Sequence, residues 1–331
     1  MKSSGIGGQA VIEGVMMRHK NDVAVAVRRP DGVIQVGRQQ FINLTEKSKI
    51  FKWPVIRGVV SFISSLIIGI KTLTYSASFF ETEEEKEKEK DSGKGENAMM
   101  FGTIAISLIF AVAIFFVLPY FVSSWIMKLT GSTSQVLLAV IEGVLKLGIF
   151  IGYIAAISLM KDIKRTFMYH GAEHKCINCI ESGKELNVDN VMKSSKEHRR
   201  CGTSFVVFVL VISIIFFMFI RVSHPVLRIV LRLVLVPVIA GVSFEFIQWA
   251  GNSDSKAAAI LARPGLWMQA LTTKEPDRSM AEVAIASVEA VFDWRAYLRE
   301  QGIDVPDPVQ PEPEPEQAES PEPEGDQSEL S

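Results

Sequence analysis

The chain is poor in the features that mark secreted proteins and many soluble enzymes. Three cysteines among 331 residues are too few, and odd in number, for a disulfide framework, and they favour a reducing compartment. Residues 1–52 contain no apolar core of a signal peptide, so no cleavable leader is expected. Neither a dinucleotide fingerprint, a P-loop nor an internal repeat is recognised, and no basic-aromatic motif indicates nucleic-acid binding.

Lysine and arginine are missing from one part of the chain. Residues 302–331 contain ten Asp or Glu and no Lys or Arg, and their Pro-Glu repeats predict a disordered acidic tail. The remainder holds 35 basic residues against 37 − 10 = 27 acidic ones, a net charge of +8. A basic body of this kind suits a membrane with anionic lipids, which are the expected partners.

Long apolar stretches are present, and 48% of the residues are hydrophobic. We predict a mainly α, polytopic helical membrane protein whose four full spans cover residues 99–127, 136–160, 203–220 and 229–250. Residues 54–79 are apolar but interrupted, because Arg57 and Lys71 leave only thirteen uncharged residues between them. A re-entrant segment is preferred there over a fifth span.

The distribution of basic residues predicts the orientation. The stretch 161–202 contains nine Lys or Arg, which places it and the C-terminus in the cytoplasm of a cell whose cytoplasmic membrane holds the spans. Three arginines oppose this assignment because they flank a turn that would lie outside, namely Arg221, Arg228 and Arg232.

Outside the spans, an N-terminal β-hairpin module is expected. Asp22–Arg28 alternates weakly, Pro30–Gly32 indicates a turn, and Val33–Val36 returns as a second strand. The preceding glycine-rich Gly7–Arg18 is interpreted either as a phosphate-binding nest or as a site of tight backbone packing. A capping-box pattern at Ser279 predicts a cytoplasmic or interfacial amphipathic helix to about residue 300. The chain thus divides into segments 1–52, 53–80, 81–98, 99–160, 161–202, 203–250, 251–301 and 302–331.

The strongest chemical motif is H-x-x-E-H, formed by His170, Glu173 and His174. On a helix the two histidines share one face, at the spacing by which two imidazoles reach one metal ion. The order is that of the inverzincin signature, in which the glutamate acts as the general base toward water. The pattern therefore predicts a divalent metal, with zinc preferred, and Glu173 as the catalytic residue.

Such a site needs a third protein ligand, and several residues compete for this role. Glu245 follows the second histidine by 71 residues and lies in an apolar span, where an acid needs a metal, a basic partner or a proton. His198 and Cys201 offer an H-x-x-C pair in the same polar stretch as the motif. Together with Cys176 and Cys179 that pair could also form a separate structural zinc site. The sequence leaves these alternatives open.

Several motifs, taken together and in this order, resemble the YqhQ family of bacterial multi-pass membrane proteins: Gly7–Arg18, Pro54–Gly58, Tyr169–Lys175, Arg200–Phe205, Ser243–Phe246 and Pro264–Thr273. The resemblance covers roughly residues 5–300. It implies a metal-dependent enzyme without a defined substrate. Where the family has His-Pro-Arg-Cys, this chain has Arg199 after the histidine. Cys176 and Cys179 fall outside the family pattern, so the resemblance favours as the metal ligands His170, His174, His198, Cys201 and Glu245.

The function predicted from these residues is a zinc-dependent hydrolase at the inner membrane surface, acting on a membrane peptide or a lipid-linked substrate. Membrane lipids are expected partners, nucleic acid is not, and the oligomeric state stays open. The main alternative is a membrane scaffold or assembly factor with a structural metal. A transporter using Glu142 and Glu245 is a weaker alternative because matched broken helices are lacking.

Overall fold

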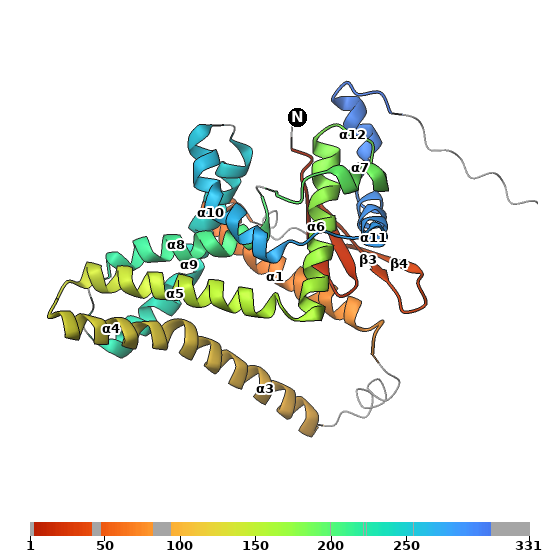
Figure 1. Cartoon of the computed structure of the whole chain (residues 1–331). Helices are drawn as coiled ribbons and strands as arrows, with labels where there is room; N and C mark the ends of the chain where they lie inside the picture. Colours follow the sequence, from red (N-terminus) through yellow and green to blue (C-terminus); the bar gives the residue numbers. More distant parts are fainter. Residues whose placement is uncertain are drawn as a thin grey trace, which may run out of the picture.

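The computed structural model describes residues 3–41, 48–81, 94–198, 200–220, 222, 224–253 and 255–305. This part of the chain is mostly helical and carries one sheet near its N-terminus (Figure 1). The strands are Ile6–Val11 (β1), Gly14–His19 (β2), Asp22–Arg28 (β3) and Ile34–Gln40 (β4). The predicted acidic tail beyond residue 305 and residues 82–93 of the predicted charged linker lie outside the described residues.

The helices follow the sheet in sequence. They are Ile50–Lys52 (η2, a 3-10 turn), Ile56–Ala77 (α1), Lys94–Val112 (α3), Ala113–Val117 (η3, a π-helical segment), Leu118–Thr130 (α4), Gln135–Ile157 (α5), Lys161–Glu181 (α6), Val188–Lys193 (α7), Gly202–Met218 (α8), Pro225–Asn252 (α9), Lys256–Thr272 (α10), Arg278–Glu289 (α11) and Trp294–Glu300 (α12). The polar stretch between the second and third predicted spans is therefore largely helical, and α6 carries the H-x-x-E-H motif.

The sheet is an antiparallel meander in the order β1-β2-β3-β4. The predicted hairpin of residues 22–28 with 33–36 corresponds to β3 and β4, but that prediction was incomplete because β1 and β2 extend the sheet. These strands come from the glycine-rich stretch. Two-residue turns connect β1 to β2 and β2 to β3, with positive φ at Glu13 (49°) and Lys20 (54°). Positive φ in such turns usually falls on Asn or Gly, whereas here it falls on Glu13 and Lys20, so these positions gave no turn signal in the sequence.

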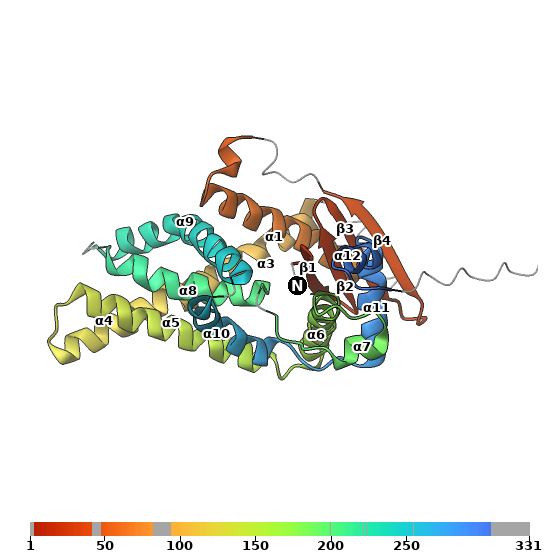
Figure 2. The same cartoon turned by 90° about the horizontal axis from the view of Figure 1, so that it is seen from above.

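Both faces of the sheet are covered. Val15 and Met17 point into a core formed with α6 and α11, whereas Met16 and Val25 point to the other face and pack with Ile68 of α1. Figure 2 shows α6 and α11 on one side of the strands and α1 on the other. We call the sheet with α6, α7, α11 and α12 the sheet body, and the remaining helices from α3 onward the helical body.

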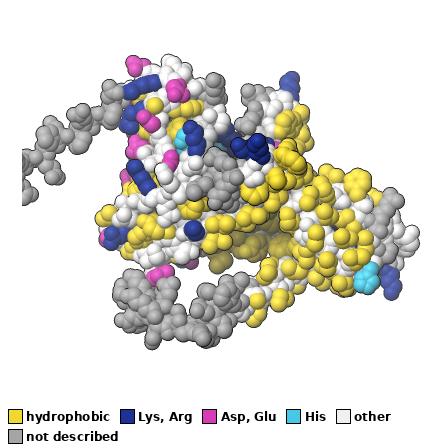
Figure 3. All heavy atoms as spheres, turned by 180° about the vertical axis from the view of Figure 1, so that it is seen from behind, with side chains coloured by type: hydrophobic (Ala, Val, Ile, Leu, Met, Phe, Trp, Pro, Cys, Tyr) yellow, Lys and Arg dark blue, Asp and Glu magenta, His cyan; other side chains and the backbone are white. Residues whose placement is uncertain are grey.

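Within the described residues, four helices are long and apolar enough to cross a membrane: Ile56–Ala77, Ala105–Thr130, Gln135–Ile157 and Val226–Ala250. The last three correspond to predicted spans. The remaining predicted span, 203–220, contains α8, which is only 17 residues long and so falls short of the roughly 20 residues that a bilayer core requires. Seen from behind, apolar side chains dominate the surface of the helical body, while charged side chains gather on the sheet body (Figure 3). These features indicate a membrane protein.

Helix α1 connects the two bodies. Its first half crosses α9, where Gly58 and Gly241 allow close approach: a Cβ atom on Gly58 would lie 2.6 Å from the carbonyl oxygen of Gly241. Its second half packs beneath the sheet, with Gly69 against the side chain of Gln9 in β1 and Ile68 in the core. The helix is long enough to span a membrane, yet its second half packs against the sheet. The choice between a re-entrant and a spanning segment stays a prediction.

We expect Gly58→Ala to destabilise the protein by about 1–3 kcal/mol, because the added methyl group must push the α1 and α9 backbones apart. Thermal unfolding of the full-length protein in detergent would measure this. Gly152→Ala in α5 is the matched control, since nothing lies within 4 Å of a Cβ atom there. Alanine at that position should be neutral or stabilising by up to about 1 kcal/mol. Equal shifts in Tm for the two variants would contradict the close crossing.

The predicted C-terminal amphipathic helix is divided into α11 and α12 by a break at residues 290–293. Asp277, rather than Ser279, caps α11 by accepting a hydrogen bond of 2.9 Å from the N–H of Met280. Its apolar side chains pack into the sheet body instead of lying free on a membrane surface. Four apolar side chains of the predicted helix are buried or half-buried in that core, namely Ile285, Val288, Phe292 and Leu298.

Candidate metal centre

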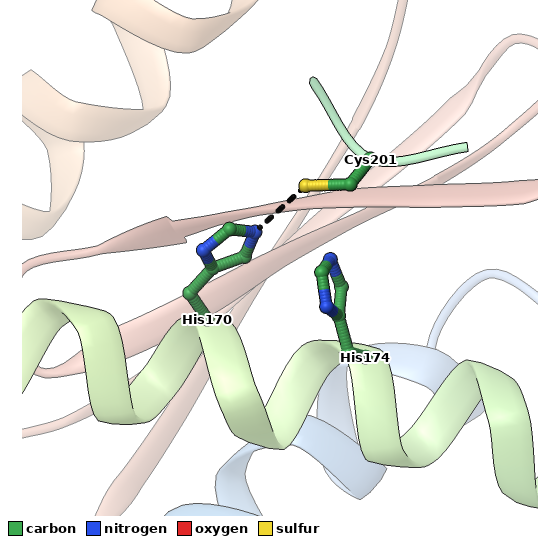
Figure 4. Close-up of side chains that lie close together, drawn as sticks. All are labelled: His170, His174 and Cys201. Carbon is green, nitrogen blue, oxygen red and sulfur yellow. Dashed lines mark hydrogen bonds between the residues drawn. The ribbon is translucent and has the colours of Figure 1, made fainter. Parts of the chain in front are cut away.

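Helix α6 presents the two histidines of the motif on one face, as the spacing predicts. The ring centroids of His170 and His174 lie 4.4 Å apart. Cys201, from the segment just before α8, approaches them from across the site (Figure 4). One ligand atom from each of the three residues lies within 4.8 Å of the other two. The structure therefore joins two predicted ligands from the motif with a third from a separate segment, in a buried group that could hold a metal ion.

Backbone carbonyl groups fix both imidazole rings. His170 Nδ1 lies 2.8 Å from the carbonyl oxygen of Thr272, and His174 Nδ1 lies 2.6 Å from that of Lys196. Because a carbonyl oxygen only accepts hydrogen bonds, each Nδ1 carries a proton, and in the neutral ring each Nε2 keeps a lone pair. Metal-binding histidines are commonly oriented in this way by the nitrogen that does not bind the metal. The orientation of both rings therefore suits the binding of a metal ion through the two Nε2 atoms.

Cys201 is held where its sulfur faces the histidines. It occupies the N-cap of α8, where its Sγ accepts a hydrogen bond of 3.4 Å from the N–H of Thr203 and lies 3.0 Å from the Thr203 hydroxyl. Its Sγ also lies 3.2 Å from His170 Nε2. Since that nitrogen carries a lone pair, the thiol is the donor. Proton loss would turn this contact into a pair of metal ligands, because the thiolate is the form of cysteine that binds metals.

Glu173 lies between the two histidines. Its Oε2 atom is 3.8 Å from His170 Nε2 and 4.0 Å from His174 Nε2. Burial raises the pKa of this carboxyl from 4.5 to about 7, although attraction to the His170 ring in its protonated form and a hydrogen bond from the N–H of Gly8 lower it. Gly8 is needed at this point of β1, because a Cβ atom there would lie 2.7 Å from Glu173 Cγ. The glycine-rich stretch thus serves tight packing, the second of its two interpretations.

His198 lies beside the ligand group in a separate polar cluster. Its ring centroid is 5.6 Å from that of His174, and its Nε2 is 3.8 Å from the carboxylate of Glu181. Arg200 forms an ion pair with the same carboxylate, and Ser4 donates to it from its N–H (2.8 Å) and its hydroxyl (2.7 Å). Burial alone would raise the pKa of Glu181, but these partners outweigh it and lower the pKa to about 2. His198 is therefore a neighbour of the group rather than a member.

The structure does not bring Glu245 to the histidines. Its carboxylate forms a bidentate ion pair with Arg57 of α1. Arg57 Nε donates to Glu245 Oε1 at 3.1 Å, and Arg57 Nη2 donates to Glu245 Oε2. Among the described residues, the group with metal-ligand spacing contains no carboxylate. The prediction of Glu245 as third ligand is thus replaced by the ion pair that the sequence had also allowed, because the crossing of α1 and α9 supplies an arginine.

Cys176 and Cys179 lie in the hydrophobic core of the sheet body. The Cys179 thiol donates to the carbonyl oxygen of Glu185 at 3.3 Å. Neither sulfur joins the described ligand group, so the alternative of a four-ligand structural zinc site is not supported. Sequence reasoning missed the carbonyl groups of Thr272 and Lys196 entirely. Every residue carries a carbonyl, so no sequence signal could have identified them.

The sequence is similar to a known protein family and to a known bacterial protein. A family model described as "Protein of unknown function (DUF1385)" matches residues 53–294. The chain belongs to the DUF1385 family. It is 35% identical over 303 residues to the "Uncharacterized protein YqhQ" of Bacillus subtilis (strain 168), an alignment covering 89% of this chain and 94% of that protein. No solved structure matches it. The resemblance predicted from the motifs is confirmed.

The part of the chain matched by the DUF1385 model contains all three residues of the ligand group as well as Glu173. Strands β1–β4 precede it. The hydrogen bond from Gly8 to Glu173 therefore joins the matched DUF1385 region to the sheet that precedes it.

Proposed function

We propose that the chain is an integral membrane metalloprotein and a zinc-dependent hydrolase at the cytoplasmic surface of a bacterial membrane. The observation that carries this proposal is the convergence of two Nε2 lone pairs, one thiol and one carboxylate at a single point. His170, His174 and Cys201 would hold the ion. Three protein ligands are typical of catalytic zinc sites, which keep a further position open. When bound, zinc acidifies water and polarises the oxygen of a substrate.

Glu173 is the proposed general base. Its carboxylate stands about 4 Å from both histidine Nε2 atoms, where it can accept the proton of an attacking water and later return it to a leaving group. The N–H of Gly8 orients this carboxylate, and the surrounding core excludes bulk water. The carbonyl groups of Thr272 and Lys196 hold the imidazoles so that neither ring has to reorganise during the reaction.

The position of the group supports a membrane-bound substrate. It lies where α8 begins and beside the middle of α6, at the junction of the two bodies (Figure 1). Close to this junction, Leu159 and Met160 are 84% and 56% exposed between α5 and α6. Exposed apolar residues at the end of a candidate span favour contact with lipid. A membrane peptide or a lipid-linked compound would reach a site at this depth more readily than a soluble substrate.

A second candidate function is a membrane scaffold or assembly factor with a structural metal. One observation favours it: His174 and Cys201 are only 1% and 4% exposed, and structural zinc sites are closed. A transporter is less well supported, because both of its proposed intramembrane carboxylates are engaged. Glu142 pairs with Arg232 and Lys146, and Glu245 pairs with Arg57.

Glu173→Gln separates the two main candidates. A hydrolase should lose activity by about 100-fold or more while keeping its metal, since a missing general base costs that much. The measurement combines elemental analysis of the purified full-length protein with turnover of fluorogenic transmembrane peptides and lipid-linked esters. Full activity of the variant would contradict the role of Glu173. The scaffold would be favoured by two results together: the wild-type protein turns over none of these substrates, and Glu173→Gln leaves its metal content unchanged.

A further inference from the structure

Basic side chains gather at the end of the helical body that is remote from the ligand group. The turn between α4 and α5 and the start of α9 both lie there, opposite the sheet (Figures 1 and 2). Figure 3 shows His and Lys or Arg side chains at the tip of this otherwise apolar end. On the predicted orientation this is the outer end, where the positive-inside rule expects few cations.

A cavity of about 280 Å³ lies at this end. It is lined mainly by hydroxyl, amide and basic side chains, together with the ring of Tyr120: Ser124, Lys128, Ser132, Thr133, Gln135 and Arg228 are among its lining residues. The volume is at the lower end of ligand pockets, which are typically about 300–1,000 Å³. It therefore suits a small polar group rather than a whole cofactor.

Arg228 is a fixed part of the cavity wall. Its side chain is only 3% exposed and lies 5.5 Å from the centroid of the Tyr120 ring. Nε donates to the carbonyl oxygen of Val222 at 2.8 Å, and Nη2 donates to the same oxygen and to Gln135 Oε1. Such bonds hold the planar guanidinium without neutralising its charge, since both acceptors are uncharged. A pre-oriented guanidinium is the group that proteins use to bind phosphate.

No acid lies in ion-pair contact with these charges within the part of the chain that the structure describes. The acid nearest to the cavity along α5, Glu142, is already paired with Arg232 and Lys146. No described salt bridge involves Arg228 or Lys128. A buried cation without an anionic partner is costly, and in a cavity it attracts an anion from outside.

We infer that this cavity binds a phosphate group at the membrane surface opposite the ligand group. Arg228 and Lys128 supply the charge, and the serine and threonine hydroxyls supply further donors. The phosphate comes either from a lipid headgroup or from a phosphate compound in solution. The site is independent of the proposed hydrolase, because none of its residues contacts the metal centre.

Binding is measured by isothermal titration of the full-length protein in a neutral detergent. The probes are dihexanoyl phosphatidylglycerol, dihexanoylglycerol, which lacks the phosphate, and inorganic phosphate. We expect saturable binding of the phosphate lipid and much weaker binding of dihexanoylglycerol. Lys128→Gln should lower the affinity for the phosphate lipid about tenfold, because one charge-assisted contact is lost. Arg228→Lys, which keeps the charge but not the planar fork, should also lower it.

Lys256→Gln is the matched control, since it removes an exposed lysine from the first turn of α10, a helix that contributes no residue to the cavity lining, and should bind as the wild type does. Competition by inorganic phosphate would show that the phosphate group alone is recognised, whereas its failure to compete would identify the lipid as the source. Equal binding of dihexanoylglycerol and the phosphate lipid would overturn the inference. So would wild-type affinity in both Lys128→Gln and Arg228→Lys.

Discussion

Replacing His174 by alanine should remove the stoichiometric metal from the purified protein. The variant keeps Cys201 and His170 but loses an Nε2 lone pair that the Lys196 carbonyl aims at the centre of the group. Residues that only orient metal ligands typically contribute 10–100-fold to affinity, so loss of a ligand should cost more than about 100-fold. Elemental analysis of protein purified without chelators measures the effect.

Two variants at residues that the sequence also nominated serve as controls. Glu245→Gln should keep the metal, because the Glu245 carboxylate pairs with Arg57 and stands apart from the ligand group. Cys179→Ser should keep it as well, because that thiol lies in the core of the sheet body. A wild-type protein free of transition metal, or metal loss in Glu245→Gln, would contradict the ligand set. Stoichiometric copper in place of zinc would exclude the hydrolase, since a site with two histidines and one cysteine also suits copper.

We expect Glu142→Gln to lower the free energy of unfolding by about 3–5 kcal/mol, the cost of leaving buried charges without their partner. Glu142 is ion-paired with Arg232 of α9 and, at 3.3 Å, with Lys146 one turn along α5. All three side chains are buried, and the ring of Phe217 lies against both Lys146 and Arg232. Thermal unfolding in detergent should show a strongly lowered Tm for the variant.

The control for this effect is an ion pair outside the membrane-spanning helices. Asp189 and Arg278 pair on the surface of the sheet body, and Asp189→Asn should leave Tm unchanged because solvent screens exposed charges. The double variant Glu142→Gln with Arg232→Gln should regain part of the lost stability, since only one uncompensated cation remains. If Glu142→Gln unfolds at the wild-type temperature, the cluster does not hold α5 to α9.

The helical part of the fold was largely predictable, because apolar length is a direct signal for a span. The sheet was only half predictable. Its β3 and β4 have alternating residues and a Pro-Asp-Gly turn. The turns from β1 to β2 and from β2 to β3 have positive φ at Glu13 and Lys20, residue types that give no turn signal. The length of α8 could not be judged from hydropathy alone, because the apolar run continues beyond the end of the helix at Met218.

The candidate site was predictable where it depends on local spacing and not where it depends on tertiary contacts. Helical periodicity joins His170 to His174, and the short distance along the chain makes Cys201 a natural candidate. Glu245 shows the limit of such reasoning. An acid in an apolar helix needs a partner, but its partner Arg57 is 188 residues away in sequence and reaches it only because two glycines let α1 cross α9 closely. No local pattern contains that crossing.

The carbonyl group that fixes His170 has a consequence for the order of biosynthesis. Thr272 follows His170 by 102 residues, at the end of α10. A ribosome therefore completes α8, α9 and α10 before this carbonyl exists, and domains of a growing chain fold as their segments emerge. Until then nothing holds the proton of His170 on Nδ1. For the proposed metal centre we therefore expect loading to be a late event, which follows the placement of α10 against α6.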